Sequence, residues 1–236
     1  MPQILMRDGA FAHVGRTAER GSYESGDALK EWGWSTMSLG EKERSVARER
    51  ILDAAYELFS REGLNAVGVD TIVARSGSGK MTLYRHFKSK EALVRAFLER
   101  REELWTKGWL EKTLLEGDRS AEDRLLGIFD AYDEWFRRAD FDGCSFINSL
   151  LEGRETETIR SAAAQHLANI RHLIERFARE AGLMDVERFA RAWHVLMKGA
   201  IVARHEGQLD AAQEAKATAR LLLASWPRQR ATAAAS

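Results

Sequence analysis

Five cations and no acid lie within the twenty residues TIVARSGSGKMTLYRHFKSK, which run from Thr71 to Lys90. The cations are Arg75, Lys80, Arg85, Lys88 and Lys90. The whole chain, by contrast, has a formal net charge of zero. A local excess of positive charge binds phosphates by releasing condensed counterions, and a neutral remainder limits non-specific attraction. The segment therefore predicts a contact with nucleic acid.

Two short helices are expected to carry these cations. Val69, Ile72 and Val73 are apolar at helical spacing, and the residues 76–79, SGSG, supply turn chemistry that ends the first helix. A second helix is expected to begin at Lys80, with Leu83 and Phe87 on one face because they are four residues apart. This pattern predicts a helix-turn-helix.

The sequence GSGKMTLYRHFKSKEAL, preceded by an amphipathic helix that ends FSREG, resembles the DNA-binding domain of the TetR (tetracycline-repressor) family. The resemblance runs from about Arg48 to about Glu102, and its sharpest part comprises Thr82, Leu83, Tyr84, Phe87, Lys90, Glu91 and Leu93. There are two departures. Gly79 stands where the family usually has a Ser or Thr cap, so no side-chain oxygen caps the second helix. Met81 occupies a position where the family often has a small residue, which could change the bases that are read.

Each residue of this region has an expected role. Arg can bond guanine bidentately and a Thr methyl group can touch thymine, so the residues around the second helix are candidates for base contacts. The resemblance implies phosphate contacts for Tyr84, His86 and Lys90, although Tyr84 could instead be a half-buried packing residue and His86 a surface residue. Arg48 could reach a phosphate or belong to a solvated face. The full candidate set is Arg48, Arg75, Lys80, Met81, Thr82, Tyr84, Arg85, His86 and Lys90.

Composition favours an all-α fold. The chain has 236 residues, 44% of them hydrophobic, and its two prolines, Pro2 and Pro227, lie near its ends. The single cysteine, Cys144, excludes an internal disulfide and suits a reducing cytosol. No apolar run approaches the roughly 20 residues that span a bilayer, and no signal peptide is recognisable. A cytoplasmic protein without a membrane segment is expected.

The predicted organisation is an N-terminal three-helix DNA-binding domain followed by a larger helical regulatory domain. The expected ranges are an arm at 1–40, the helix-turn-helix domain at 41–90, the regulatory and dimerisation domain at 91–226 and a tail at 227–236. Trp32 and Trp34 in the arm could dock or be exposed, and Met37 is a candidate true start. Apolar periodicity predicts helices over 43–62, 89–115, 121–138, 145–151, 155–181, 186–206 and 211–225. The helix over 89–115 would link the two domains.

A homodimer is expected, because one helix-turn-helix reads too few bases to find a single genomic site. The last two long helices are the candidates for the interface, through Phe189, Met197, Leu222 and Trp226. Alternatively, these apolar stripes face their own core.

Large aromatic side chains between residues 105 and 193 could line an apolar cavity for a small-molecule effector. The candidates are Trp105, Trp109, Trp135, Phe141, Phe146, His166 and Trp193. The alternative is that these rings only form a core. The resemblance implies that an effector releases the protein from its operator, and it favours a repressor over an activator.

The sequence contains no pattern typical of an enzyme. No metal-spaced His or Cys cluster or nucleophile elbow is present, and GSGK at 77–80 is half of a P-loop that does not follow a strand. No catalytic residue, metal or cofactor is therefore expected. A second alternative is a helical interaction module whose basic segment binds an acidic protein.

Overall fold

The computed structural model describes residues 39–153 and 156–229, and within them every regular element is a helix. The chain divides into two compact units at the Val94–Arg95 bond. The expected arm, its two tryptophans, the candidate start at Met37 and most of the expected tail lie outside the described residues. No helix in the described part of the chain has the length and apolar character needed to cross a bilayer.

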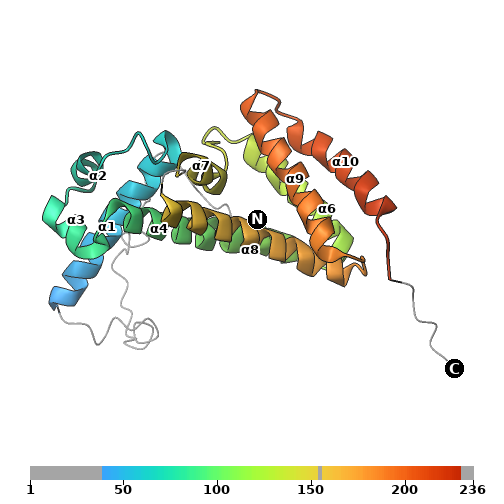
Figure 1. Cartoon of the computed structure of the whole chain (residues 1–236), viewed down its shortest axis with the longest axis horizontal. Coiled ribbons are helices and arrows are strands. Elements are labelled where there is room, and N and C mark those ends of the chain that lie inside the picture. The colour runs from blue at the N-terminus through green and yellow to red at the C-terminus, as the bar shows by residue number, and fades with distance from the viewer. Residues whose placement is uncertain (1–38, 154–155, 230–236) are drawn as a thin grey trace, which may run out of the picture. The chain divides into compact units, whose positions relative to one another are not determined.

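The N-terminal unit contains α1 (Leu39–Glu62), α2 (Val69–Ser76), α3 (Lys80–Phe87) and the first turn of α4 (Lys90–Arg101) (Figure 1). Both α2 and α3 pack against α1. Apolar residues at helical spacing build one small core, whose most buried members include Ile51, Ala55, Val67, Ile72, Leu83 and Leu93. The predicted helix-turn-helix is confirmed.

The turn between α2 and α3 depends on glycine. Gly77 ends α2 in the left-handed conformation with φ of 62°, which a side chain would disfavour. Gly79 precedes α3 and offers no side-chain cap, as the sequence predicts. Ser89, by contrast, caps α4, because its hydroxyl accepts a hydrogen bond of 3.1 Å from the backbone N–H of Ala92.

The C-terminal unit is a helical bundle that begins within α4. It continues through η2 (Glu102–Glu111), α5 (Lys112–Leu115), α6 (Ala121–Phe136), α7 (Ser145–Glu152), α8 (Glu157–Glu180), α9 (Val186–His205) and α10 (Ala211–Ser225). α10 packs on α6 and α9, and α8 packs on α6, α7 and α9 (Figure 1). The all-α class is confirmed, and α6 to α10 begin and end within two residues of the predicted bounds.

The predicted linking helix is continuous, but its middle is wound differently. α4, η2 and α5 follow one another without a break, and η2 is a π-helix, in which hydrogen bonds join residues five apart. Gly108 suits this winding, because a Cβ atom there would lie 2.8 Å from the carbonyl oxygen of Glu103. Glu102, Thr106 and Leu110 form the buried side of η2.

Candidate nucleic-acid interface

One face of α3 is exposed along its whole length. Met81 is 81% exposed and Tyr84 is 41% exposed, and Arg85 and Lys88 are exposed as well. The opposite face carries Leu83, which is fully buried. Positions 81, 84, 85 and 88 recur at three and four residues, so they form one outward stripe on the helix. This stripe is available to a partner without any repacking of the core.

Two cations of this stripe, Arg85 and Lys88, act on His86 together with Arg44 and Arg48 of α1, and we refer to these four cations as the α3 patch. Their effect is visible at His86, which lies half-buried on α3. Burial lowers the pKa of His86, and each of the four cations lowers it further. The imidazole is therefore neutral in a strongly positive environment.

Arg85 and Lys88 have no carboxylate partner among the residues that the structure describes. Arg48 holds Glu49 through a hydrogen bond of 2.9 Å, and its guanidinium lies 5.1 Å from the centroid of the Phe87 ring. The α3 patch thus keeps most of its positive charge, and its members Arg85 and Lys88 lie on the outward face of α3 with Met81. Such a surface can bind phosphates and place the stripe against base edges.

Besides Arg48, three of the predicted contact residues already hold partners within the protein. Arg75 forms a bidentate pair with Glu57, donating from Nη2 to Oε1 at 2.8 Å and from Nε to Oε2 at 3.0 Å. Lys90 donates a hydrogen bond of 2.6 Å from Nζ to the carbonyl oxygen of Leu64. These interactions hold α2 and the start of α4 against their neighbours, and the predicted DNA contacts of Arg75 and Lys90 stay predictions.

Lys80 is the third, with its Nζ 2.8 Å from a carboxylate oxygen of Asp70. This hydrogen bond and the charge of Asp70 raise the pKa of Lys80. Both side chains are largely exposed, so a phosphate could compete for the lysine. The half-buried Thr82 lies on the same helix.

Lys88 is a residue that the candidate set lacked. It ends α3 with φ of 62°, a conformation that costs a residue with a side chain about 1–2 kcal/mol. Backbone strain of this kind is often kept where a side chain has a role in function. The sequence could have indicated Lys88 through its spacing. Lys88 follows Met81 by seven residues and Tyr84 by four, which places it on the same outward side of the helix.

The aromatic residues of the C-terminal unit fall into separate groups. Trp105 lies 4.3 Å from both Trp109 and Trp135 between ring centroids, and Trp135 lies 4.9 Å from Phe141. Trp193 instead packs in the core against Phe129. The candidates for an effector site therefore do not form one lining, and Trp105, Trp109 and Phe141 are half-buried.

A buried polar network joins η2 to α8. Glu102 forms a short contact with Nδ1 of His166 and accepts a hydrogen bond of 2.7 Å from Nδ2 of Asn169. The His166 ring is stacked on Phe146 at 5.1 Å. Sequence reasoning included His166 but missed Glu102, which looks like any acid of a solvated helix face.

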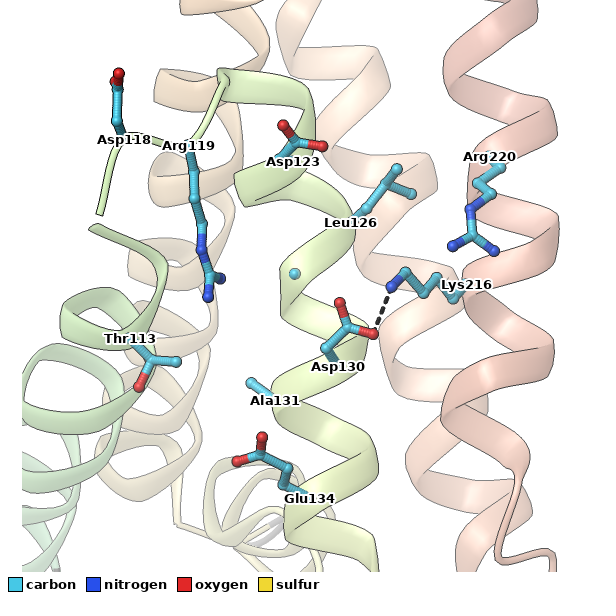
Figure 2. A pocket seen from close by; sticks show the side chains of 11 residues that line it. Thr113, Asp118, Arg119, Asp123, Leu126, Asp130, Ala131, Glu134, Lys216 and Arg220 are labelled. Carbon is cyan, nitrogen blue, oxygen red and sulfur yellow. Dashed lines mark hydrogen bonds and ion pairs between the residues drawn. The ribbon is translucent and has the colours of Figure 1, made fainter. Parts of the chain in front are cut away.

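Two grooves on the C-terminal unit have polar rather than aromatic linings. Figure 2 shows the first, where Asp130 of α6 pairs with Lys216 of α10. The remaining lining comes from Thr113, Asp118, Arg119, Asp123, Leu126, Gly127, Ala131, Glu134 and Arg220. Its mixed charges differ from the apolar cavity that the sequence predicted. The second groove lies along α8 and α9 and is described below.

The residues predicted for a dimer interface have different exposures. Phe189 and Met197 are fully buried within the C-terminal unit, so they belong to its own core. Leu222 and Trp226 are half-buried. The indole of Trp226 donates a hydrogen bond of 2.7 Å to the carbonyl oxygen of Met184.

These observations define the N-terminal unit as a helix-turn-helix domain with a basic outward helix. Residues 51–97 match the family model described as bacterial regulatory proteins, tetR family. The N-terminal unit is thus a DNA-binding domain of the TetR family. The relatives and solved structures that match the chain are transcriptional regulators by name.

Relatives in two bacteria match the chain. The regulator QacR of Staphylococcus aureus is 39% identical over 67 residues, which are 28% of this chain and 36% of QacR. The chain thus spans about a third of the length of that relative. The transcriptional repressor ComR of Escherichia coli is 28% identical over 169 residues, which are 68% of this chain and 80% of ComR.

Solved structures support the fold over about three quarters of the chain. A TetR-family transcriptional regulator from Streptomyces coelicolor has a TM-score of 0.69 at 23% identity, covering 76% of this chain and 95% of that one. The regulatory protein TetR from Rhodobacter sphaeroides has a TM-score of 0.63 at 24% identity, covering 77% and 99%. At these identities the likeness concerns the fold alone.

Proposed function

We propose that the protein is a DNA-binding transcriptional repressor whose helix α3 enters the major groove. The observation that carries this proposal is the exposed stripe of α3 together with the α3 patch, in which Arg85 and Lys88 have no carboxylate partner among the described residues. The match to the TetR family supports it, and the relative ComR is a transcriptional repressor by name. Binding to DNA would place the protein in the cytoplasm.

Within the groove, the residues of α3 divide into two roles. Arg85, Thr82 and Met81 face the base edges, where Arg reads guanine and the apolar Met81 side chain contacts a thymine methyl group. Tyr84 and Lys88 bind phosphates and fix the register of the helix. An exposed methionine at this position is chemically suited only to apolar contacts, so it should favour a thymine in the half-site.

The protein acts as a homodimer in this proposal, with α9 and α10 at the interface. Val195 and Val202 are 66% and 52% exposed on α9, with the exposed Gly199 between them, and Leu221 is 73% exposed on α10. Positions 195, 199 and 202 follow helical spacing, so they form one apolar stripe with a small residue that permits close approach. Two copies joined here would read two half-sites of a palindrome.

A small apolar effector releases the repressor in this proposal. The support is the group formed by Trp105, Trp109 and Phe141, whose rings are half-buried and therefore partly accessible. An effector that binds one arrangement of these rings more tightly would shift the population of conformations by its differential affinity alone. The continuous helix from α4 to α5 links this group covalently to the helix-turn-helix domain.

The proposal is tested by selecting binding sites from a random duplex pool at near-physiological salt. The wild-type protein should recover a palindrome, and Arg85→Ala should relax the preference at one position of each half-site. Tyr84→Phe removes only a hydroxyl and should lower affinity without changing the selected sequence. Failure to enrich any sequence would contradict DNA reading by α3 and favour an acidic protein partner.

Two further measurements address the dimer and the effector. Val195→Glu should convert the protein to a monomer in sedimentation velocity, whereas the exposed Leu104→Glu, outside α9 and α10, should leave the dimer intact. For the effector, a library of apolar compounds is tested for release of the selected duplex. No release by any compound would contradict this part of the proposal.

A further inference from the structure

A groove runs between α8 and α9, and we call it the α8–α9 groove. It has a cavity volume of about 540 Å³. Its lining consists of Arg171, His172 and Glu175 from α8 and Glu187, Arg191, His194, Val195 and Lys198 from α9. Apart from Val195, every lining side chain is polar or titratable, and among them His194 is buried.

Two cations of the groove have no anionic partner within the described part of the chain. Arg171 donates only a long hydrogen bond of 3.3 Å to the carbonyl oxygen of Leu167 on its own helix. Lys198 is half-buried. Burial lowers the pKa of Lys198, and the nearby Arg171 lowers it further. The fold thus holds two like charges close together.

Other cations of the same unit are neutralised. Arg176 pairs with Glu111 at 2.8 Å and Arg124 pairs with Glu180 at 3.0 Å. A repelling pair of cations costs free energy, so its presence beside a cavity is best explained by an anion that enters the cavity.

His194 provides a buried polar group in the same lining. It is 3% exposed, and its Nδ1 atom has no hydrogen-bond partner. Burial lowers the pKa of His194 to about 3, with further contributions from Lys198 and Arg171. A neutral imidazole carries one N–H donor and one acceptor, so it can donate to an oxyanion without adding another repelling charge.

We propose that the α8–α9 groove binds a small molecule through an oxyanion group, a carboxylate or a phosphate, which contacts Arg171, Lys198 and His194. Val195 offers an apolar surface to the remainder of the molecule. This site is separate from both the α3 stripe and the aromatic group around Trp105, and it does not depend on DNA binding. It shares Val195 with the α9 stripe proposed for the dimer interface.

The two acids of the lining bear on the charge of the ligand. Glu187 lies 3.9 Å from Arg191, one turn away on α9, so this pair offsets its own charge. Glu175 is half-buried on α8, one turn after Arg171. These acids oppose a second negative charge, so a carboxylate should bind more tightly than a phosphate dianion.

The test titrates the full-length protein with sodium acetate and with inorganic phosphate, against sodium chloride at equal ionic strength. Binding is followed by the NMR shifts of the His194 imidazole and by calorimetry. Saturable binding is expected for at least one probe, and acetate binding more tightly than phosphate would identify the carboxylate as the source. Saturation by neither probe would overturn the proposal.

Variants locate the site. Arg171→Gln and Lys198→Gln should each weaken binding about tenfold or more, because each removes one charge-assisted hydrogen bond. Lys198→Arg keeps the charge and should restore binding, which separates loss of the contact from misfolding. Arg179→Gln, on an exposed turn of α8 outside the groove, should bind as the wild type does. Unchanged binding in both Arg171→Gln and Lys198→Gln would refute the assignment. The assignment would also be refuted if these two variants changed the monomer–dimer equilibrium and left binding of the probe as it is in the wild type.

Discussion

Replacing Lys88 by glutamine should change how steeply DNA affinity falls with salt. Lys88 is exposed, lies at the end of the α3 stripe and has no carboxylate partner in the described structure, so its charge is available to a phosphate. Each phosphate neutralised contributes about 0.9 to the slope of log affinity against log salt. The proposed dimer carries two copies of Lys88, so the slope should become shallower by about 1.8.

The same argument gives a change in affinity. When the salt rises from 50 to 200 mM, the wild-type protein should lose about twelvefold more of its DNA affinity than Lys88→Gln does, because the salt rises fourfold and the slopes differ by about 1.8. The assay is fluorescence anisotropy with the selected palindrome at four or more salt concentrations. A slope for Lys88→Gln equal to that of the wild type would refute the reasoning.

Arg75→Gln is the matched control within the same basic segment. Arg75 is already neutralised by its bidentate pair with Glu57, so its removal should leave the slope unchanged. It should instead lower the free energy of unfolding by up to about 1 kcal/mol, because the pair is partly exposed. A slope change as large as that of Lys88→Gln would show that Arg75 leaves Glu57 to bind DNA.

Lys88→Gly separates charge from backbone strain. Glycine adopts the φ of 62° at this position without the steric cost that a side chain brings. The variant should therefore raise the free energy of unfolding by about 1 kcal/mol while it shows the same shallow salt slope as Lys88→Gln. A loss of stability would mean that the lysine side chain makes a larger packing contribution than its exposure indicates.

Three other outcomes are expected from the C-terminal unit, each measured by denaturant unfolding. Glu102→Ala should lower the free energy of unfolding by about 3 kcal/mol, because it leaves the buried His166 and the half-buried Asn169 without their acceptor, and Glu102→Gln should cost less. The pKa of His194 is about 3 in the folded protein and about 6.5 in the unfolded chain. As the pH falls below 6.5, the unfolded chain binds a proton at this residue and the folded protein does not, so the free energy of unfolding decreases. Between pH 7 and pH 5 the free energy of unfolding should decrease by about 2 kcal/mol. His194→Gln should not show this decrease, whereas His172→Gln, at an exposed residue, should show it in full. Gly143→Ala should lower the free energy of unfolding by about 2 kcal/mol, because φ is 77° and the new Cβ would lie 2.2 Å from Nε2 of His205. In the double variant with His205→Ala, the part of this loss that comes from the clash with His205 should disappear, and the part that comes from the positive φ should remain.

Helix bounds and the DNA-binding motif could be predicted from the sequence, because they depend on local patterns. Apolar spacing marks the helices, and Gly77 and Ser89 mark where helices end and begin. The resemblance to the TetR family rests on consecutive residues of α3 and α4, so it needed no tertiary information. These features are encoded within a few turns of the chain.

Features that depend on distant partners could not be predicted. Nothing near Arg75 in the sequence indicates Glu57, eighteen residues earlier, and nothing near Glu102 indicates His166, sixty-four residues later. A buried acid and a solvated acid look alike until the neighbouring helix is placed. For the same reason, the apolar residues of α9 could not be divided between the core, which takes Phe189, and the exposed stripe, which takes Val195.

The concentration of positive charge in the α3 patch, on a chain of zero net charge, also affects the speed of the search for a site. At about 0.15 M salt, electrostatic forces reach only about 8 Å. A protein without net charge is not drawn to DNA from afar, and the α3 patch attracts the duplex only once α3 already faces it. Encounters in other orientations therefore end quickly, and those that last begin with the reading helix beside the groove. The association rate should accordingly depend on salt through the α3 patch alone, with little contribution from the rest of the surface.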